Sequence, residues 1–242
     1  MDTENWQSRT EALLGVEAVK SLGAARVLVA GVGGVGGYVA ETLVRSGIGA
    51  ITIVDADTVA ESNINRQLIA TCATVGMPKA ELWRQRLLSI NPQCNIEALQ
   101  LFITPDNLSE LFVSDYDYVA DCIDTVAPKV ALLRETVRRR IPVVSSMGAG
   151  GRLDPSKIAL GNLWDTREDG LARAVRQRLK ALGERPNIKV VWSSESPRRS
   201  ALLDIEGMEN KRSSFGILAT IPAIFGLFMA NRIIVELSSK RQ

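Results

Sequence analysis

A glycine-rich segment is the first part of the sequence whose residue types could do chemistry. Gly31, Gly33, Gly34 and Gly36 lie within six residues. Between a strand and a helix, such glycines let the backbone approach a phosphate closely and point the helix N-terminus at its negative charge. Asp55 follows nineteen residues after Gly36, where a carboxylate can accept hydrogen bonds from ribose hydroxyls. The pair indicates a nucleotide site; glycines that merely make a tight turn are the alternative.

A polar and cationic cluster follows and bears on which nucleotide binds. Asn63, Arg66 and Gln67 come shortly after Asp57, and Lys79 follows within a predicted helix. A dehydrogenase needs no such cations at this point. A triphosphate does, because charge builds up on the pyrophosphate leaving group as the bond to the α-phosphorus breaks, and fixed cations stabilise it. We therefore expect ATP, with bidentate contacts from Arg66 and a point charge from Lys79.

A further candidate, Asp124, ends the apolar run 116–124. Open parallel sheets bind ligands at the carboxyl ends of their strands, and a carboxylate there could hold Mg²⁺. Capping of the helix that begins around Thr125 is the alternative. The residues alone leave both interpretations open.

The amino-acid composition excludes several catalytic and metal-binding mechanisms. The 242 residues include no histidine, which excludes an imidazole base, a Ser-His-Asp triad and a His-bound metal. Cys72, Cys94 and Cys122 form no CxxC pair, so neither a zinc site nor a disulfide framework is indicated. An apolar content of 46% and a net charge of +2 are typical of a globular chain. Cysteine use and the acidic N-terminus favour the cytoplasm.

Alternating strands and helices must position these residues. The remaining predicted strands are 26–31, 50–57, 94–103, 141–151, 153–163 and 187–195, and the predicted helices are 10–23, 38–47, 77–92, 104–112, 128–140 and 169–183. The first two strands and the helix between them form a right-handed βαβ unit. The predicted fold class is α/β: a Rossmann-like, parallel, ATP-binding half over 1–150, then a mixed or antiparallel substrate and dimer half over 151–242, in a single domain 1–242.

Residues 213–231 carry no charge and approach the length of a membrane span. Two glycines, two serines and Pro222 dilute their apolar character. We expect a buried helix at a subunit interface. Peripheral or membrane association is the disfavoured alternative.

Several motifs in order and in register carry a family resemblance: GVGGVG, VDADTVAESNINRQ, VGMPKAE, INP and DCIDT. They resemble the ubiquitin-activating-enzyme-like adenylyltransferases of the ThiF and MoeB type. The resemblance places Gly33 and Gly36 at the phosphates, Asp55 at the ribose, Asn63, Arg66, Gln67 and Lys79 at the triphosphate, and Asp124 at magnesium. It also implies a homodimer in which Arg9 reaches into the partner subunit's site. We add Gly31, Gly34 and Asp57 to the nucleotide-binding set, and take Arg9, Arg66, Lys79 and Asp124 as catalytic candidates.

The second half narrows the resemblance to one branch. Members that charge a sulfur carrier hold zinc through two CxxC pairs, and no cysteine follows Cys122. The segments WxxRT, IPVVSSMGAGG and FGILATIPAIFG instead resemble the tRNA threonylcarbamoyladenosine dehydratases across nearly the whole chain. That branch uses ATP to activate the threonyl carboxylate beside the anticodon, and the side chain then cyclises with loss of water. Some relatives carry a cysteine where residues 211–214 read KRSS here, which puts a cysteine-dependent step in doubt.

The resemblance also suggests a partner for a basic segment. The segment from Gly170 to Arg199 contains eight basic residues and only two acidic ones. Arg173, Arg176 and Lys180 line one face of the predicted helix. Contact with tRNA phosphates is the expectation, and a solvated face is the alternative. Two other functions remain in view: adenylation of the C-terminus of a ubiquitin-like sulfur carrier, and NAD-dependent oxidoreduction. A cysteine-desulfurase or other sulfur-acceptor partner is also left open.

Overall fold

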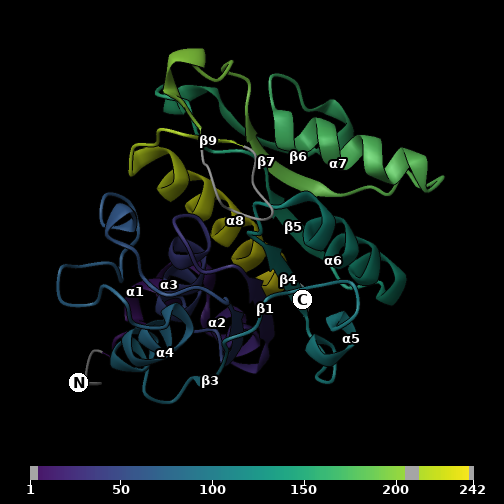
Figure 1. Ribbon diagram of the computed structural model, residues 1–242. Coiled ribbons are helices and arrows are strands. Elements are labelled where there is room, and N and C mark those ends of the chain that lie inside the picture. The colour runs from purple at the N-terminus through teal and green to yellow at the C-terminus, as the bar shows by residue number, and fades with distance from the viewer. Residues whose placement is uncertain (1–4, 205–212, 240–242) are drawn as a thin grey trace.

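A seven-stranded sheet runs through the middle of the molecule in the computed structural model, which describes residues 5–204 and 213–239 (Figure 1). Its strands are β1 (Arg26–Ala30), β2 (Ala50–Val54), β3 (Asn95–Leu99), β4 (Tyr118–Asp121), β5 (Val143–Ser146), β6 (Ile158–Asn162) and β7 (Lys189–Ser193). Their order is β3-β2-β1-β4-β5-β7-β6, and every neighbouring pair is parallel except β6 and β7. The α/β class with a mixed second half is thereby confirmed, and one sheet joins both halves.

Helices cover both faces of this sheet. They are α1 (Ser8–Leu14), α2 (Val16–Ala24), α3 (Gly36–Arg45), α4 (Lys79–Ile90), α5 (Leu108–Leu111), α6 (Val126–Arg139), α7 (Gly170–Ala181) and α8 (Thr220–Ser239). The core residues of α2, α3, α4 and α8 pack on one face, and those of α5, α6 and α7 on the other. In β1, Val27 and Val29 belong to the first core, whereas Leu28 and Ala30 belong to the second. Burial on both faces explains why the strands read as continuous apolar runs.

Short elements complete the described chain. These are the 3₁₀ turns η1 (Glu61–Asn63), η2 (Pro155–Lys157), η3 (Leu163–Asp165) and η4 (Arg199–Ala201), and a small antiparallel pair, β8 (Leu202–Asp204) and β9 (Ser213–Phe215).

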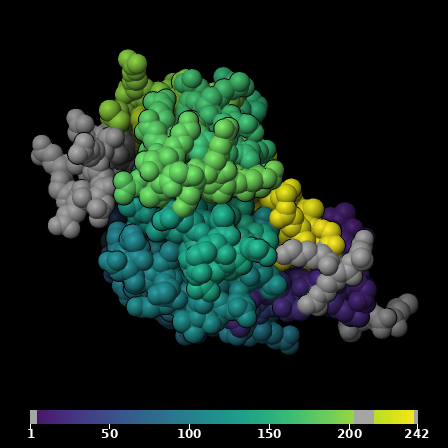
Figure 2. Space-filling model, turned by 90° about the vertical axis from the view of Figure 1, so that its right-hand side faces the viewer, coloured from purple at the N-terminus to yellow at the C-terminus, as the bar shows by residue number. Residues whose placement is uncertain are grey.

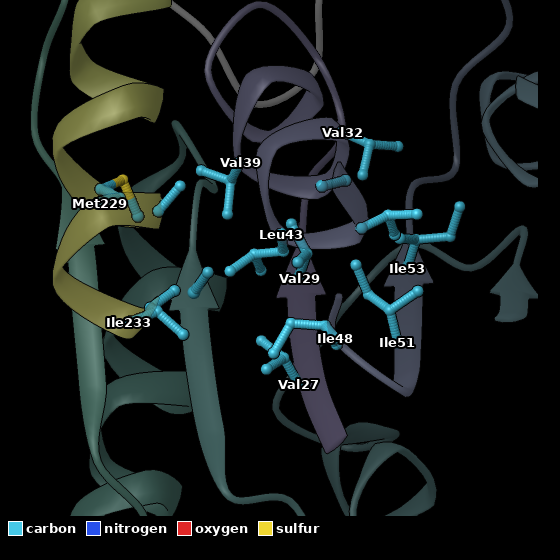
Figure 3. Close-up of a cluster of buried hydrophobic side chains, with 14 of the residues drawn as sticks. Val27, Val29, Val32, Val39, Leu43, Ile48, Ile51, Ile53, Met229 and Ile233 are labelled. Atoms are coloured by element: carbon cyan, nitrogen blue, oxygen red, sulfur yellow. The ribbon is translucent and has the colours of Figure 1, made fainter. Parts of the chain in front are cut away.

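Helix α8 accounts for the uncharged segment. By length and composition alone it could cross a bilayer, but nine of its residues are buried. Met229 and Ile233 point toward Val39 and Leu43 of α3, within one cluster of buried side chains (Figure 3). Full burial of each such side chain is worth about 1.5–3 kcal/mol, so packing explains the apolar sequence. A buried helix is confirmed, but its nine buried residues lie in the core of the chain itself, and the expected subunit interface stays a prediction. The helix begins at Thr220, and residues 213–215 form a strand.

The start of α8 also supports the glycine-rich loop. A Cβ on Gly226 would lie 2.5 Å from the carbonyl oxygen of Val35. The Pro222 side chain is also close to the loop: it lies 3.5 Å from the position of a Cβ on Gly34. The loop and α8 are therefore in direct contact, although they are distant in sequence.

Some predicted boundaries were wrong. The single helix predicted at 10–23 is two helices, α1 and α2, because Gly15 between them has φ +89°, a conformation that breaks helix geometry and that glycine tolerates. The strand predicted at 50–57 ends at Val54, before its acidic residues. The strand predicted at 94–103 and the helix predicted at 104–112 are shortened to Asn95–Leu99 and Leu108–Leu111.

Candidate functional site

The glycine-rich loop leaves the carboxyl end of β1 and enters α3. Gly31 has φ +83°, and its amide donates to the carbonyl of Val54. At Gly36 a Cβ would lie 1.8 Å from the carbonyl oxygen of Gly31 and 3.2 Å from the Cβ of Cys122. Only glycine fits there, so the loop folds tightly onto the N-terminus of α3. No side chain caps that N-terminus, and its amide dipoles suit an anion such as a phosphate.

Asp55 lies beside this loop and holds it. Its carboxylate accepts hydrogen bonds from the amides of Val32 and Asp57, both at 2.9 Å. Burial raises the pKa of the Asp55 carboxyl, and the Lys79 ammonium opposes that shift. The indole of Trp83 also donates to the Val32 carbonyl, at 2.8 Å. The predicted ribose-binding carboxylate is thus fixed at the edge of the loop.

Lys79 is the first residue of α4, and Asp57 holds both its side chain and its backbone. Its ammonium donates to Asp57 at 2.7 Å, and its amide donates to the Asp57 carbonyl. The Lys79 side chain is only 6% exposed, whereas that of Asp57 is 68% exposed. Asp57 therefore fixes the direction of the Lys79 cation, a role that the sequence pattern did not distinguish from direct nucleotide contact.

The turn from η1 places the remaining polar residues against the glycines. Asn63 is buried, its side chain accepts from the amide of Ala60, and its carbonyl accepts from the amides of Arg66 and Gln67. Arg66 lies 3.4 Å from the position of a Cβ on Gly34. Asn63 thus shapes the turn that brings Arg66 and Gln67 to the loop.

Gln67 carries an unpaired acceptor within this site. The side chain is buried, and its Nε2 lies 3.4 Å from the position of a Cβ on Gly33. Its Oε1 has no hydrogen-bond partner in the described part of the chain. A buried polar atom without a partner is costly, so this oxygen could accept a hydrogen bond from a hydroxyl or amino group of a bound nucleoside, whereas phosphate oxygens, which are acceptors, could meet only the Nε2 group.

Arg66 and Asp124 lie close enough for their charges to interact. Burial lowers the pKa of the Arg66 guanidinium, and the charge of Asp124 opposes that shift. The Arg66 guanidinium also donates to the Ser62 carbonyl at 2.8 Å and to the Asn65 side chain at 2.9 Å. It is therefore fixed in direction before any ligand binds.

Asp124 is exposed and lies beyond the end of β4, not within the strand as predicted. Thr125 occupies the N-cap position of α6, although its side chain makes no capping hydrogen bond, so Asp124 is not the N-cap. Among the described residues no cluster of three acidic or thiol side chains could hold a metal. A magnesium ion here would thus have Asp124 as its protein ligand and would depend on phosphate oxygens and water for the rest.

The remaining catalytic candidate, Arg9, is exposed on α1. That helix buries none of its residues within the subunit. Trp6, which precedes α1, is 55% exposed, and Leu13, which lies on α1, is 82% exposed.

The second half contributes a buried polar hub above the carboxyl ends of β5 and β7. Arg152 pairs with Asp169 at 3.1 Å and donates to the carbonyls of Gly148, Glu168 and Glu195. Asp169 in turn caps α7. Next to it lies a hollow of about 210 Å³, bordered by Arg198 and by residues 216–218. Sequence patterns missed this hub, because its members are isolated charges in three separate segments.

Helix α7 lies next to α6 on the face shown in Figure 2. Arg173 and Lys180 are exposed, and Lys180 and Arg185 both lie over the ring of Trp164. Arg176 differs from the expectation, because its guanidinium turns inward to the Leu163 carbonyl and the Thr166 hydroxyl. It is therefore less available to an external phosphate than its neighbours on the helix.

Fold and site together define a Rossmann-like α/β protein in which a glycine-rich loop lies beside two cations held in fixed positions. The family model described as the ThiF family matches residues 7–242. The chain therefore belongs to the ThiF family.

Individual relatives narrow the comparison. The chain is 37% identical over 237 residues to the tRNA threonylcarbamoyladenosine dehydratase of Bacillus subtilis, covering 95% of this chain and 93% of that protein. The solved structure of TcdA from E. coli, the enzyme of the same name in complex with ATP, aligns with a TM-score of 0.88 and 36% identity, covering 97% of this chain and 94% of that one. The molybdopterin-synthase adenylyltransferase of E. coli is 37% identical, but only over 140 residues, 58% of this chain and 54% of that protein.

Proposed function

We propose that this protein is an ATP-dependent dehydratase that cyclises threonylcarbamoyladenosine beside the anticodon of tRNA. The observation that carries the proposal is the extent of the match. Dehydratases match both halves of the chain, whereas the molybdopterin-synthase relative matches little more than half. The site fits ATP, because Gly36 lets the loop close onto the uncapped N-terminus of α3, and Arg66 and Lys79 are held as fixed cations.

The residues of the site divide the work of the first step. A threonyl carboxylate is already a nucleophile, so the absence of histidine from the sequence is no obstacle. When its oxygen bonds to the α-phosphorus, the bond to the β-phosphate breaks and pyrophosphate leaves. Lys79 and Arg66 stabilise the charge that develops on this leaving group, and Asp124 would hold Mg²⁺, which supplies further charge neutralisation.

Ring closure then requires positioning above all. The ureido group of the same side chain attacks the activated carbonyl, and the nucleotide leaves with the former carboxylate oxygen. Because this attack is intramolecular, no covalent enzyme intermediate is required. The hollow beside Arg152 and Arg198 belongs to the second half of the chain, which we propose as the substrate half. The doubt about a cysteine-dependent step stays open. Cys72 is exposed, and residues 211 and 212 of the KRSS segment, where some relatives carry a cysteine, lie outside the described residues.

One experiment separates the candidate functions. Purified protein is supplied with Mg·ATP and tRNA that carries threonylcarbamoyladenosine, and pyrophosphate and the nucleosides are measured by mass spectrometry under mild conditions. We expect tRNA-dependent pyrophosphate release and a nucleoside lighter by one water. Release that depends instead on a carrier ending in Gly-Gly would favour the alternative function. Hydride transfer to NAD without ATP use would reject both.

A homodimer is part of the proposal. Trp6, Leu13 and Val16 expose apolar surface around α1, and Leu227 and Phe228 do so on α8. Helix α2 packs between α1 and α8. We expect light scattering to give twice the subunit mass. If Arg9 completes the partner's site, dimers that combine one inactive Arg9→Ala subunit with one inactive Lys79→Ala subunit regain about half of the activity, because one of their two sites is intact; a random mixture of the two variants regains about a quarter. No recovery in proven mixed dimers would contradict this role for Arg9.

The surface of α7 carries a prediction about tRNA binding. Replacing Arg173 and Lys180 together by alanine removes two exposed cations, so binding of tRNA should weaken. The slope of log affinity against log salt should also fall by roughly two. Lys20→Ala, which removes an exposed lysine from α2, is the matched control. Filter binding over a salt series measures both, and an unchanged slope would show that α7 is only a solvated face.

We propose that the protein acts in the cytoplasm. Two points favour this location: its proposed substrate is tRNA, and the apolar residues of α8 pack inside the protein. A sulfur-acceptor partner remains a prediction.

A further inference from the structure

A fully buried ion pair lies next to the strand end from which the glycine-rich loop leaves. Lys129 of α6 and Asp121 at the end of β4 are both 0% exposed, and their charged atoms lie 2.6 Å apart. Lys129 also donates to the hydroxyl of Ser145 at 3.0 Å and to the carbonyl of Ser146 at 2.9 Å. The Ser145 hydroxyl donates to the same Asp121 oxygen at 2.6 Å. One ammonium therefore joins α6 to the carboxyl ends of β4 and β5.

The three protons of Lys129 are all used by these contacts, and no part of the side chain reaches solvent. Lys129 therefore has no donor left for a substrate. Burying two charges is costly even when they are paired. Packing alone does not explain the pair, because apolar residues of similar size often fill such positions with equal or greater stability.

The other Asp121 oxygen connects the pair to the site. It accepts a hydrogen bond from the amide of Ile123 at 3.1 Å and so fixes the turn that follows β4. The carbonyl of Cys122 in this turn lies 3.1 Å from the position of a Cβ on Gly31. The turn therefore packs against the start of the glycine-rich loop. Asp124, whose charge interacts with that of Arg66, comes one residue after Ile123.

We propose that Lys129 is a positioning residue for the adenylation step: through Asp121 it fixes the turn 122–124 that supports the glycine-rich loop and directs Asp124. This inference rests on the proposed function for its kinetic part, but its structural part concerns the loop alone. A role in fold stability only is the competing explanation.

The test uses two variants of the full chain and a matched control. Lys129→Met leaves Asp121 buried and unpaired, and this variant is expected to lose stability. The double variant Lys129→Met with Asp121→Asn removes both charges, and its melting temperature should recover. Thr136→Val is the control, since Thr136 is also buried in α6 and bonds only within its own helix turn, to the Leu133 carbonyl.

Two readouts are measured on protein shown to be folded. The first is kcat and KM for ATP-pyrophosphate exchange with threonylcarbamoyladenosine tRNA, where the double variant should lose about tenfold or more in kcat. The second is the NMR signal of the Trp83 indole, which reports the loop through its bond to Val32. That signal can be assigned by replacing Trp6, Trp164 and Trp192 in turn with phenylalanine. The double variant should shift it, and Thr136→Val should not.

The outcomes separate the two explanations. Equal kcat and an unshifted Trp83 signal in a stable double variant would overturn the positioning role, as would equal losses in Thr136→Val at the same melting temperature. A wild-type protein with no exchange activity would reject the proposed function instead, and a shifted Trp83 signal in the double variant would still support the link between Lys129 and the loop.

Discussion

Replacing Lys79 by alanine is expected to slow ATP-dependent product formation about a hundredfold, a loss of roughly 3 kcal/mol in transition-state stabilisation. The Lys79 ammonium is almost fully buried and fixed by Asp57, so its orientation costs nothing at the moment of reaction. Arg66→Ala should cost a similar factor, because the Arg66 guanidinium is also held in place, by Ser62 and Asn65.

Single-turnover assays with saturating tRNA measure this loss. Arg84→Ala is the matched control, since Arg84 lies on the same helix and pairs with Glu81 at the surface. Asp57→Asn should give an intermediate loss, because the Lys79 cation remains but its direction is less fixed. Unchanged product formation in Lys79→Ala or Arg66→Ala would reject the assignment of these cations to the leaving group.

Replacing Gly36 by alanine should weaken ATP binding about a hundredfold or more, since a misplacement of only 1 Å can cost that much. The new methyl group would overlap the Gly31 carbonyl at 1.8 Å. That contact is with backbone, which cannot rotate away, so the loop must open and its amides move away from the phosphates.

Calorimetric titration with Mg·ATP measures the effect, with thermal melting to show that the variant folds. Gly33→Ala should lose less, because its methyl group would meet only the flexible Gln67 side chain, at 3.4 Å. Gly170→Ala is the neutral control, since nothing lies within 4 Å of a Cβ there. Tight ATP binding by a folded Gly36→Ala protein would contradict the loop geometry described above.

Much of the fold follows from local patterns. Buried parallel strands are continuous apolar runs and helices have apolar residues at intervals of three and four, so the existence and order of the elements along the chain were predictable. The position of Gly15 was visible in the sequence, but its positive φ was not. The 3₁₀ turn η1 was also missed, because it is fixed by the side chain of Asn63, not by a repeating pattern.

The candidate site was predictable where its residues belong to continuous motifs. Gly33, Gly34, Arg66 and Gln67 were expected together, and the structure brings them into contact. Lys129 was not found, because one lysine in a predicted helix gives no sign that it turns inward. The inward turn of Arg176 toward Thr166 was missed for the same reason. Side-chain direction in such cases depends on tertiary contacts that no local pattern contains.

The contact between α8 and the glycine-rich loop has a consequence for protein synthesis and for truncation. Every nucleotide-binding motif is complete once the ribosome has passed Asp124. Pro222 and Gly226, which brace Gly34 and Val35, are translated much later. A nascent or shortened polypeptide could thus contain all the recognisable motifs and still be unable to retain ATP.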